Sequence, residues 1–215
     1  MMRQESVGLP EGYPRSVEVR RRATREEVTI ELTRKSIHLL IAFVPLLLSL
    51  SKPMTIALLA AGTSAYAIFE ALRMRGISVP LVSKLTARAA RIRDNGRFVT
   101  GPVTLGLGAL ACVLFLRPVP TSIAIYVLAF GDIFSSLVGK TLGRIGMPFT
   151  HGKSVEGSLT CFVVSLISAF AITRKPGSSF LIAAVSTFVE ALPAKDWDNI
   201  LLPLAAGLTA TLLGL

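Results

Sequence analysis

Residues 130–157 read FGDIFSSLVGKTLGRIGMPFTHGKSVEG, and the rest of the chain can be placed around this stretch. Asp132, two serines and several glycines interrupt an otherwise apolar run. A polar loop with Lys153, Ser154 and Glu156 follows, and the chain then becomes apolar again. Charged side chains are rare within membrane helices and usually have a partner or a function there. The stretch therefore predicts a polar site built into a helix bundle.

The composition predicts an all-α integral membrane protein. Of the 215 residues, 52% are hydrophobic and 17% are charged, and the mean hydropathy is +0.63. Long stretches are apolar on every helical face, which is typical of helices surrounded by lipid. Cys112 and Cys161 both lie in such stretches and form neither a CxxC pair nor a disulfide framework.

Seven apolar segments predict about seven transmembrane helices. They cover residues 36–51, 54–72, 99–116, 119–138, 156–173, 178–192 and 199–215. The capping-box pattern of Thr24 and Glu27 predicts an N-terminal helix that runs into the first segment. The basic stretch 73–98 predicts an interfacial helix between spans two and three. We therefore expect a polar basic tail, residues 1–23, and a single polytopic membrane catalytic domain, residues 24–215.

Lysine and arginine are distributed unevenly about these seven spans. One side would receive 19 of the 23 basic residues, and the other side would receive only Lys52, Arg117, Arg174 and Lys175. Because basic residues are retained on the cytoplasmic side, we expect a cytoplasmic N-terminus and a C-terminus on the far side. No acid in or beside the spans falls on the far side. The acids thus predict an active site open to the cytoplasm, with basic loops that attract an anionic substrate.

Asp132 is the residue that packing explains least. Ser135, Ser136 and Gly139 share its helical face, and small residues of this kind also let helices approach closely. Carboxylates with open positions suit Mg²⁺ (or Mn²⁺), which takes oxygen ligands and bridges to phosphates. Two histidines far apart in sequence and two apolar cysteines support a zinc site poorly.

The loop 139–157 is rich in glycine and carries lysines, a combination that can bind phosphate groups. It is not a P-loop, because Met147 stands where that pattern needs a glycine five positions before Gly152. The alternative start at Gly139 fails likewise, because Phe134 stands where its glycine should be.

Four groups of residues, in order along the chain, together resemble a known family. They are Glu31, Arg34, Lys35 and His38; Thr100 and Gly101; Gly131, Asp132, Ser135, Ser136, Gly139, Gly143 and residues 153–157 (KSVEG); and Glu190, Pro193, Asp198, Asn199 and Pro203. The pattern resembles the phytol/dolichol kinase family. These are integral-membrane, typically CTP-using lipid-alcohol kinases with a diacylglycerol kinase branch, related to phosphatidate cytidylyltransferases. The match covers about residues 27–207, and departs from the family around residues 101–104 and 194–197.

The resemblance implies transfer of a γ-phosphoryl group from a nucleoside triphosphate, CTP above all, to a lipid hydroxyl. Implied catalytic residues are Asp132, Lys153 and Glu156, and implied metal ligands are Asp132, Glu156 and Asp198. The implied nucleotide-binding residues are Gly131, Ser135, Ser136, Gly139, Lys140, Lys153, Ser154, Gly157, Arg34 and Lys35. Glu31, His38, Glu190 and Asn199 are candidates for the base or for contact with the lipid hydroxyl.

The sequence leaves alternatives open for the reaction, the base and the lipid acceptor. A phosphatidate cytidylyltransferase would use the same metal and nucleotide parts, and a small transporter would also contain buried acids. The base could be Asp132, Glu190 or Asp198, and the acceptor could be phytol, polyprenol, dolichol or diacylglycerol. Expected partners are a membrane lipid and a nucleoside triphosphate, with a homodimer as a further option. The net charge of +10 is read as a topology signal rather than as a sign of nucleic-acid binding.

Overall fold

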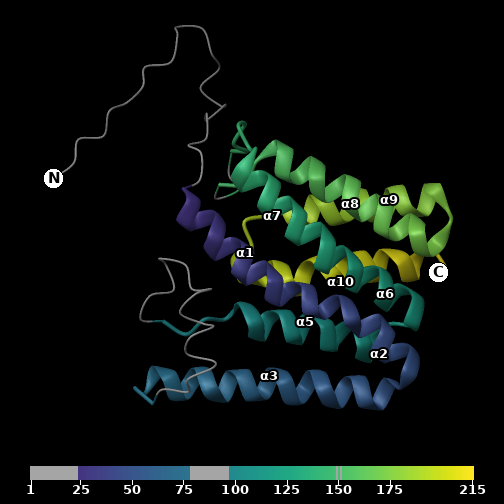
Figure 1. The fold of residues 1–215 in the computed structure, drawn as a ribbon. Helices are drawn as coiled ribbons and strands as arrows, with labels where there is room; N and C mark the ends of the chain where they lie inside the picture. The colour runs from purple at the N-terminus through teal and green to yellow at the C-terminus, as the bar shows by residue number, and fades with distance from the viewer. Residues whose placement is uncertain (1–23, 78–96, 149, 151) are drawn as a thin grey trace, which may run out of the picture.

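The computed structural model describes residues 24–77, 97–148, 150 and 152–215 (Figure 1). The predicted tail and most of the predicted interfacial helix lie outside these residues. The helices are α1 (Arg25–Leu39), η1 (Leu40–Phe43), α2 (Val44–Leu50), α3 (Lys52–Met74), α5 (Gly101–Phe115), α6 (Pro118–Tyr126), η3 (Val127–Gly131), α7 (Asp132–Thr141), α8 (Val155–Thr173), α9 (Pro176–Ala191), η4 (Lys195–Trp197) and α10 (Asp198–Leu212). Across the described part of the chain the architecture is helical, as predicted.

Each of the seven apolar segments contains helix, but the helices differ in length. Within the described residues, four continuous helical units are long and apolar enough to cross a membrane: Arg25–Leu50, Lys52–Met74, Pro118–Thr141 and Val155–Thr173. Helices α5, α9 and α10 have 15, 16 and 15 residues, fewer than the roughly 20 that an upright span needs. The fold is therefore that of a membrane helix bundle, and the count of seven spans stays a prediction.

Local sequence explains where the helical unit Arg25–Leu50 begins and why its pitch changes at η1. The Oγ1 atom of Thr24 accepts from the Glu27 N–H at 3.2 Å, and the Thr24 N–H donates to Glu27 Oε2 at 2.8 Å. The predicted capping box is thus confirmed. Pro45 has no N–H to offer the Ile41 carbonyl, which accepts instead from Val44, and the turn before it tightens into η1.

Helices α6, η3 and α7 form the continuous unit Pro118–Thr141, which also shapes the site. Residues Val127–Gly131 adopt a π-helical turn immediately before Asp132, and four of these five residues are buried. A π turn inserts an extra residue into the helix and often occurs at functional sites. Here it precedes the face of α7 that carries Asp132 and Ser135.

The helices lie side by side, with α8 and α9 along one edge and α3 along the other (Figure 1). The buried core runs between them and includes Ile123 of α6, Leu128 of η3 and Leu202 of α10. Helices α5 and α10 approach closely, because a Cβ atom on Gly108 would lie 2.2 Å from the Asn199 carbonyl oxygen. This contact brings the start of α10 against α5.

The two ends of the bundle differ in charge. One end carries the basic residues of its helix starts and ends, namely Lys52, Arg117, Arg174 and Lys175. The opposite end gathers the start of α1, the end of α7 and the start of α10 (Figure 1). Among the described residues, the four basic residues that the sequence assigned to one side therefore lie at one end of the bundle, while the full charge distribution and the orientation in a membrane stay predictions.

Candidate active site

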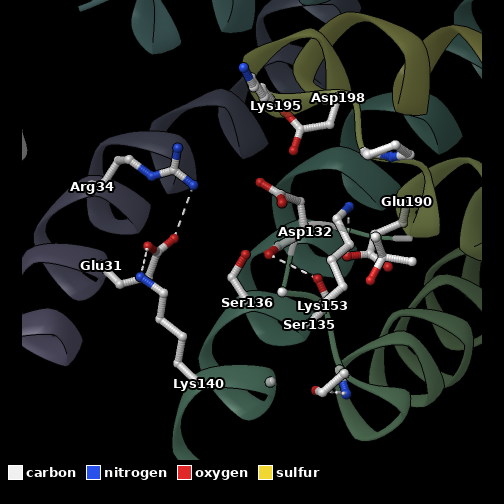
Figure 2. Close-up of a pocket in the computed structure, with 16 residues that line it drawn as sticks. Glu31, Arg34, Asp132, Ser135, Ser136, Lys140, Lys153, Glu190, Lys195 and Asp198 are labelled. Carbon is white, nitrogen blue, oxygen red and sulfur yellow. Dashed lines mark hydrogen bonds and ion pairs between the residues drawn. The ribbon is translucent and has the colours of Figure 1, made fainter. Parts of the chain in front are cut away.

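A pocket of about 220 Å³ opens where α1, α7, α8, α9 and the start of α10 converge (Figure 2). The charged residues predicted for the site that line it are Glu31, Arg34, Asp132, Lys140, Lys153, Glu190 and Asp198. The predicted small residues that line it are Ser135, Ser136, Gly139, Ser154 and Gly157. The pocket thus brings together side chains as far apart in sequence as Glu31 and Asp198.

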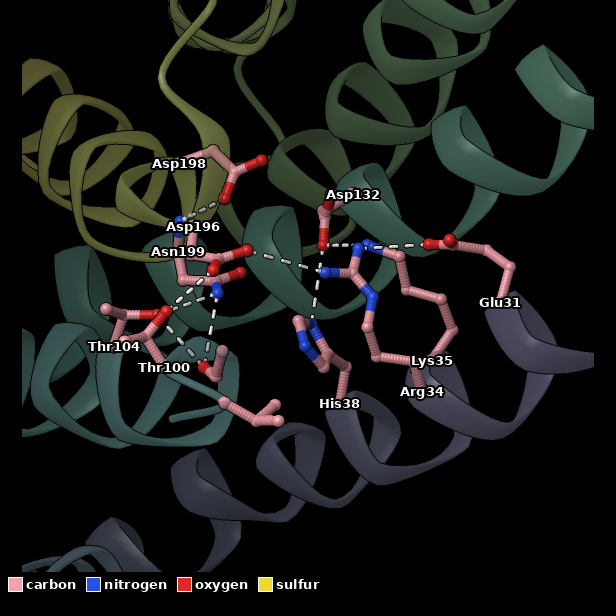
Figure 3. Close-up of polar contacts among 12 residues, drawn as sticks. Glu31, Arg34, Lys35, His38, Thr100, Thr104, Asp132, Asp196, Asp198 and Asn199 are labelled. Carbon is pink, nitrogen blue, oxygen red and sulfur yellow. Dashed lines mark hydrogen bonds and ion pairs between the residues drawn. The ribbon is translucent and has the colours of Figure 1, made fainter. Parts of the chain in front are cut away.

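Asp132 is held by two side chains of α1. The Lys35 ammonium forms an ion pair with Oδ2 of Asp132, and Nδ1 of His38 lies 3.4 Å from the same oxygen (Figure 3). Lys35 and His38 are three positions apart and therefore share a face of the helix. Both are buried, with 2% and 1% of their surface exposed. Neither lines the pocket, so the structure places them as partners of Asp132 behind it.

Glu31 joins α1 to α7 on the other side of the pocket. Its side chain is fully buried and accepts from Nη2 of Arg34 at 3.0 Å and from Nζ of Lys140 at 2.5 Å. Nη1 of Arg34 also lies 3.9 Å from Asp196, whose other oxygen accepts from Thr100 Oγ1 at 2.7 Å (Figure 3). This series of contacts connects the start of α5, the α9–α10 connection, α1 and α7.

Glu190 is the acid that α9 contributes. Its Oε1 lies 3.2 Å from Nζ of Lys153, and its Oε2 accepts from Ser158 Oγ at 3.0 Å. One oxygen is therefore held by a neutral hydroxyl and the other faces a lysine that lines the pocket. Ser158 was not singled out from sequence, because it reads as one more small residue of an apolar helix.

The predicted metal ligand Glu156 lies apart from the pocket. Its carboxylate accepts from the backbone N–H groups of Arg144 and Ile145 at 2.9 and 3.2 Å. Beside it, Oγ of Ser154 accepts from the Gly157 N–H at 3.1 Å and caps α8. Glu156 therefore braces the connection between α7 and α8 in this structure, and Ser154 serves both the helix start and the pocket wall.

The small residues allow close helix contacts at the site. A Cβ atom on Gly157 would lie 2.9 Å from the Ser135 carbonyl oxygen, and one on Gly131 would lie 2.9 Å from Ser165 Oγ. Glycine at these positions lets α8 pack directly on the π turn and on α7. Gly157 is part of the pocket lining, whereas Gly131 is not.

Asn199 also lies behind the pocket rather than in it. Its Nδ2 donates to the Gly101 carbonyl at 3.3 Å and to Thr104 Oγ1 at 3.0 Å. It is buried, with 2% of its surface exposed. These bonds join the start of α10 to the first turn of α5 and so hold the neighbouring Asp198 in place.

Four lining residues were not predicted: Thr150, Gly152, Pro193 and Lys195. Pro193 belongs to the late motif, but Thr150 and Lys195 carry no sequence signal of their own. Thr100 was part of the resemblance, yet nothing in the sequence indicates its partner Asp196. Contacts between residues 96 positions apart can be found only from the fold.

The described residues fit a divalent cation in part. Asp132 and Asp198 both line the pocket, and Mg²⁺ in phosphate-handling sites is commonly held by one or two carboxylates together with substrate phosphates. Within the described part of the chain, no group of three or more His, Cys, Asp or Glu side chains is placed to hold a metal ion. The described residues therefore match a cation site in which Asp132 and Asp198 are the protein ligands and phosphate oxygens complete the coordination. Glu156 is not part of that site.

The chain is similar in sequence to plant phytol kinases. It is 31% identical over 147 residues to the probable chloroplastic phytol kinase of Triticum aestivum, covering 60% of this chain and 49% of that protein. It is 27% identical over 157 residues to phytol kinase 1, chloroplastic, of Arabidopsis thaliana, covering 65% and 52%.

A third relative matches over more of the chain. Probable phytol kinase 3, chloroplastic, of Glycine max is 28% identical over 218 aligned residues, covering 89% of this chain and 66% of that protein. The chain spans about half the length of the first two relatives. No protein-family model and no solved structure matches it. The resemblance drawn from the motifs is confirmed by these curated relatives.

Proposed function

We propose that this chain is a membrane lipid kinase that transfers the γ-phosphoryl group of a nucleoside triphosphate, with CTP as the first candidate, to a lipid hydroxyl. The observation that carries the proposal is the pocket itself. Asp132, Glu190 and Asp198 line it together with Arg34 and Lys153, at one end of a bundle whose helices can cross a membrane. Acids for a metal or base and cations for phosphates are the parts that phosphoryl transfer needs.

The similarity to phytol kinases supports the reaction class and places phytol first among the acceptors to be tested. The other lipid alcohols of the family, polyprenol and dolichol, and diacylglycerol follow. The acceptor hydroxyl would enter from the membrane boundary, because residues at the start of α8, the end of α9 and the start of α10 line the pocket. We assign that end to the cytoplasmic side, where the nucleotide is available and where basic residues are retained.

In the proposed reaction, the lipid hydroxyl oxygen attacks the γ-phosphorus. The bond between the γ-phosphorus and the β–γ bridging oxygen breaks, and the nucleoside diphosphate leaves. The hydroxyl proton passes to Glu190, whose carboxylate is oriented by Ser158. Lys153, Lys140 and Arg34 bind phosphate oxygens. Mg²⁺ or Mn²⁺ held by Asp132 and Asp198 would neutralise charge on the phosphates.

The test is a transfer assay with purified protein in lipid nanodiscs. CTP labelled at the γ or at the α phosphorus is supplied with phytol, polyprenol, dolichol or diacylglycerol, and the lipids are separated by thin-layer chromatography. A kinase labels the lipid from the γ position alone. The Lys175→Ala variant, altered at the opposite end of the bundle, should transfer label at the wild-type rate.

Two results would contradict the proposal. Label that reaches phosphatidate only from the α position would identify a cytidylyltransferase, which attacks the α-phosphorus and releases pyrophosphate. Absence of labelled lipid with every acceptor, with CTP and with ATP, would reject phosphoryl transfer, and solute flux in liposomes would then favour a transporter.

A further inference from the structure

We propose that Lys195 is a phosphate-binding residue of this pocket, presented by a strained turn and directed to the triphosphate of the nucleotide. Lys195 belongs to the connection between α9 and α10 and lines the pocket (Figure 2). The inference rests on the proposed function, because it names a residue that would hold that reaction's nucleotide.

Lys195 differs from the other cations that line the pocket. Arg34 and Lys140 both contact Glu31, and Lys153 contacts Glu190. The side chain of Lys195 makes no hydrogen bond or ion pair with any residue that the structure describes. A phosphate that binds the paired cations must compete with a carboxylate. Lys195 offers its charge without such competition, and charge-assisted bonds to phosphate are among the stronger hydrogen bonds.

The backbone at Lys195 is strained. Its φ angle is +51°, in the left-handed region where a residue with a side chain meets steric repulsion and glycine does not. Such conformations persist when their surroundings impose them, and they concentrate at functional sites. Glycine would suit this turn better if the backbone alone mattered. The presence of lysine is explained if its charged side chain is needed in the pocket.

Neighbouring contacts hold the turn in this conformation. The next residue, Asp196, accepts from Thr100 Oγ1 at 2.7 Å and lies 3.9 Å from Nη1 of Arg34. Pro193, two residues earlier, also lines the pocket and has a fixed φ. With Asp196 tied to α5 and α1, the backbone of the turn that carries Lys195 is held in place before any nucleotide arrives.

Arg174 provides a matched control in the same chain. It is also basic and also has a positive φ, +55°, but it caps α8 at the opposite end of the bundle. A left-handed residue there is an ordinary way to end a helix. The experiment compares Lys195→Gly and Arg174→Gly in nanodiscs by melting temperature and by calorimetric binding of CTP, CDP and CMP.

We expect both glycine variants to melt at or above the wild-type temperature, because each relieves backbone strain. Lys195→Gly should bind CTP at least tenfold more weakly, with CMP affinity changed less than twofold, whereas Arg174→Gly should bind CTP like the wild type. Lys195→Ala, which keeps a side chain at the same φ, should lose CTP affinity to the same degree. Lys195→Arg should restore it to within threefold.

The outcomes separate this inference from the proposed function. If Lys195→Gly and Lys195→Ala bind CTP as the wild type does while label transfer continues, the inference is wrong and the kinase proposal stands. If CTP and CMP lose affinity equally, Lys195 does not act on the triphosphate and the inference is again wrong. A wild-type protein that binds no nucleotide overturns both.

Discussion

The ion pair of Lys35 with Asp132 is the feature on which the site depends at the scale of single residues. Both side chains are buried, with His38 beside the carboxylate. Removing two charges from water is costly, and the cost is offset only while each charge keeps its partner. The pair therefore links stability to function, since the carboxylate proposed for the chemistry is also what compensates the buried lysine.

A double-mutant cycle at Lys35 and Asp132 separates these two effects. Asp132→Asn and Lys35→Met should each lower the free energy of unfolding by about 3–5 kcal/mol, because each leaves a buried group without its partner. The double variant should regain most of that loss yet still lack transfer activity. Unfolding in mixed micelles and the γ-label assay measure the two quantities. Near-wild-type turnover in the double variant would remove Asp132 from the chemistry.

Glu190 and Ser158 lead to a second residue-scale prediction. Glu190→Gln should lower kcat by about 10²–10⁴-fold, the contribution typical of a general base, with little change in the KM for CTP. Ser158→Ala removes only the bond that orients the carboxylate and should give a smaller loss in kcat. Steady-state kinetics at saturating lipid measure both. Equal kcat values for wild type and Glu190→Gln would assign the base to another acid.

At the scale of helices, the spacing of α5 and α10 controls the start of α10. A Cβ atom on Gly108 would meet the Asn199 carbonyl at 2.2 Å, and backbone cannot yield as a flexible side chain can. Asn199 in turn bonds to the first turn of α5. Gly108 does not line the pocket. A substitution there should nevertheless displace Asp198, because α10 would have to shift relative to α5.

Gly108→Ala should lower both the melting temperature and the transfer rate, because α10 must shift to admit the methyl group. Gly62→Ala is the control, since Gly62 lies in α3 and a Cβ there meets nothing within 4 Å. That substitution should be neutral or stabilising, by up to about 1 kcal/mol of helix propensity. If both variants melt and turn over alike, the close contact of α5 with α10 does not determine the site.

At the scale of the whole molecule, the bundle has a pocket end and an opposite end, where α8 ends and α9 begins. Single cysteines test which side of the membrane each end faces, because the natural Cys112 and Cys161 are buried. Arg144→Cys, in the connection between α7 and α8, should react with an impermeant maleimide from the cytoplasmic side only. Lys52→Cys and Lys175→Cys should react from the far side only. Labelling of all three from one side would refute the proposed topology.

The sequence determined the helical membrane fold, the capping box at Thr24 and most of the pocket lining. These features follow from local chemistry. Apolar runs are long enough to cross a bilayer, and a threonine side chain caps its own helix. Charged residues are rare within membrane segments unless they have a partner or a function. The placement of Lys52, Arg117, Arg174 and Lys175 at one end could also be predicted, because successive spans that run in alternating directions return the chain to the same end.

Tertiary structure alone decided which of the described charges are paired, and that Lys195 differs from the other cations lining the pocket in having no side-chain partner among the described residues. It placed Lys35 and His38 behind Asp132, moved Glu156 away from the pocket to brace a loop, and brought Thr100 to Asp196. It also set the strained turn that presents Lys195. Such contacts join residues far apart in the chain, so their energy depends on distances that only the packed helices define.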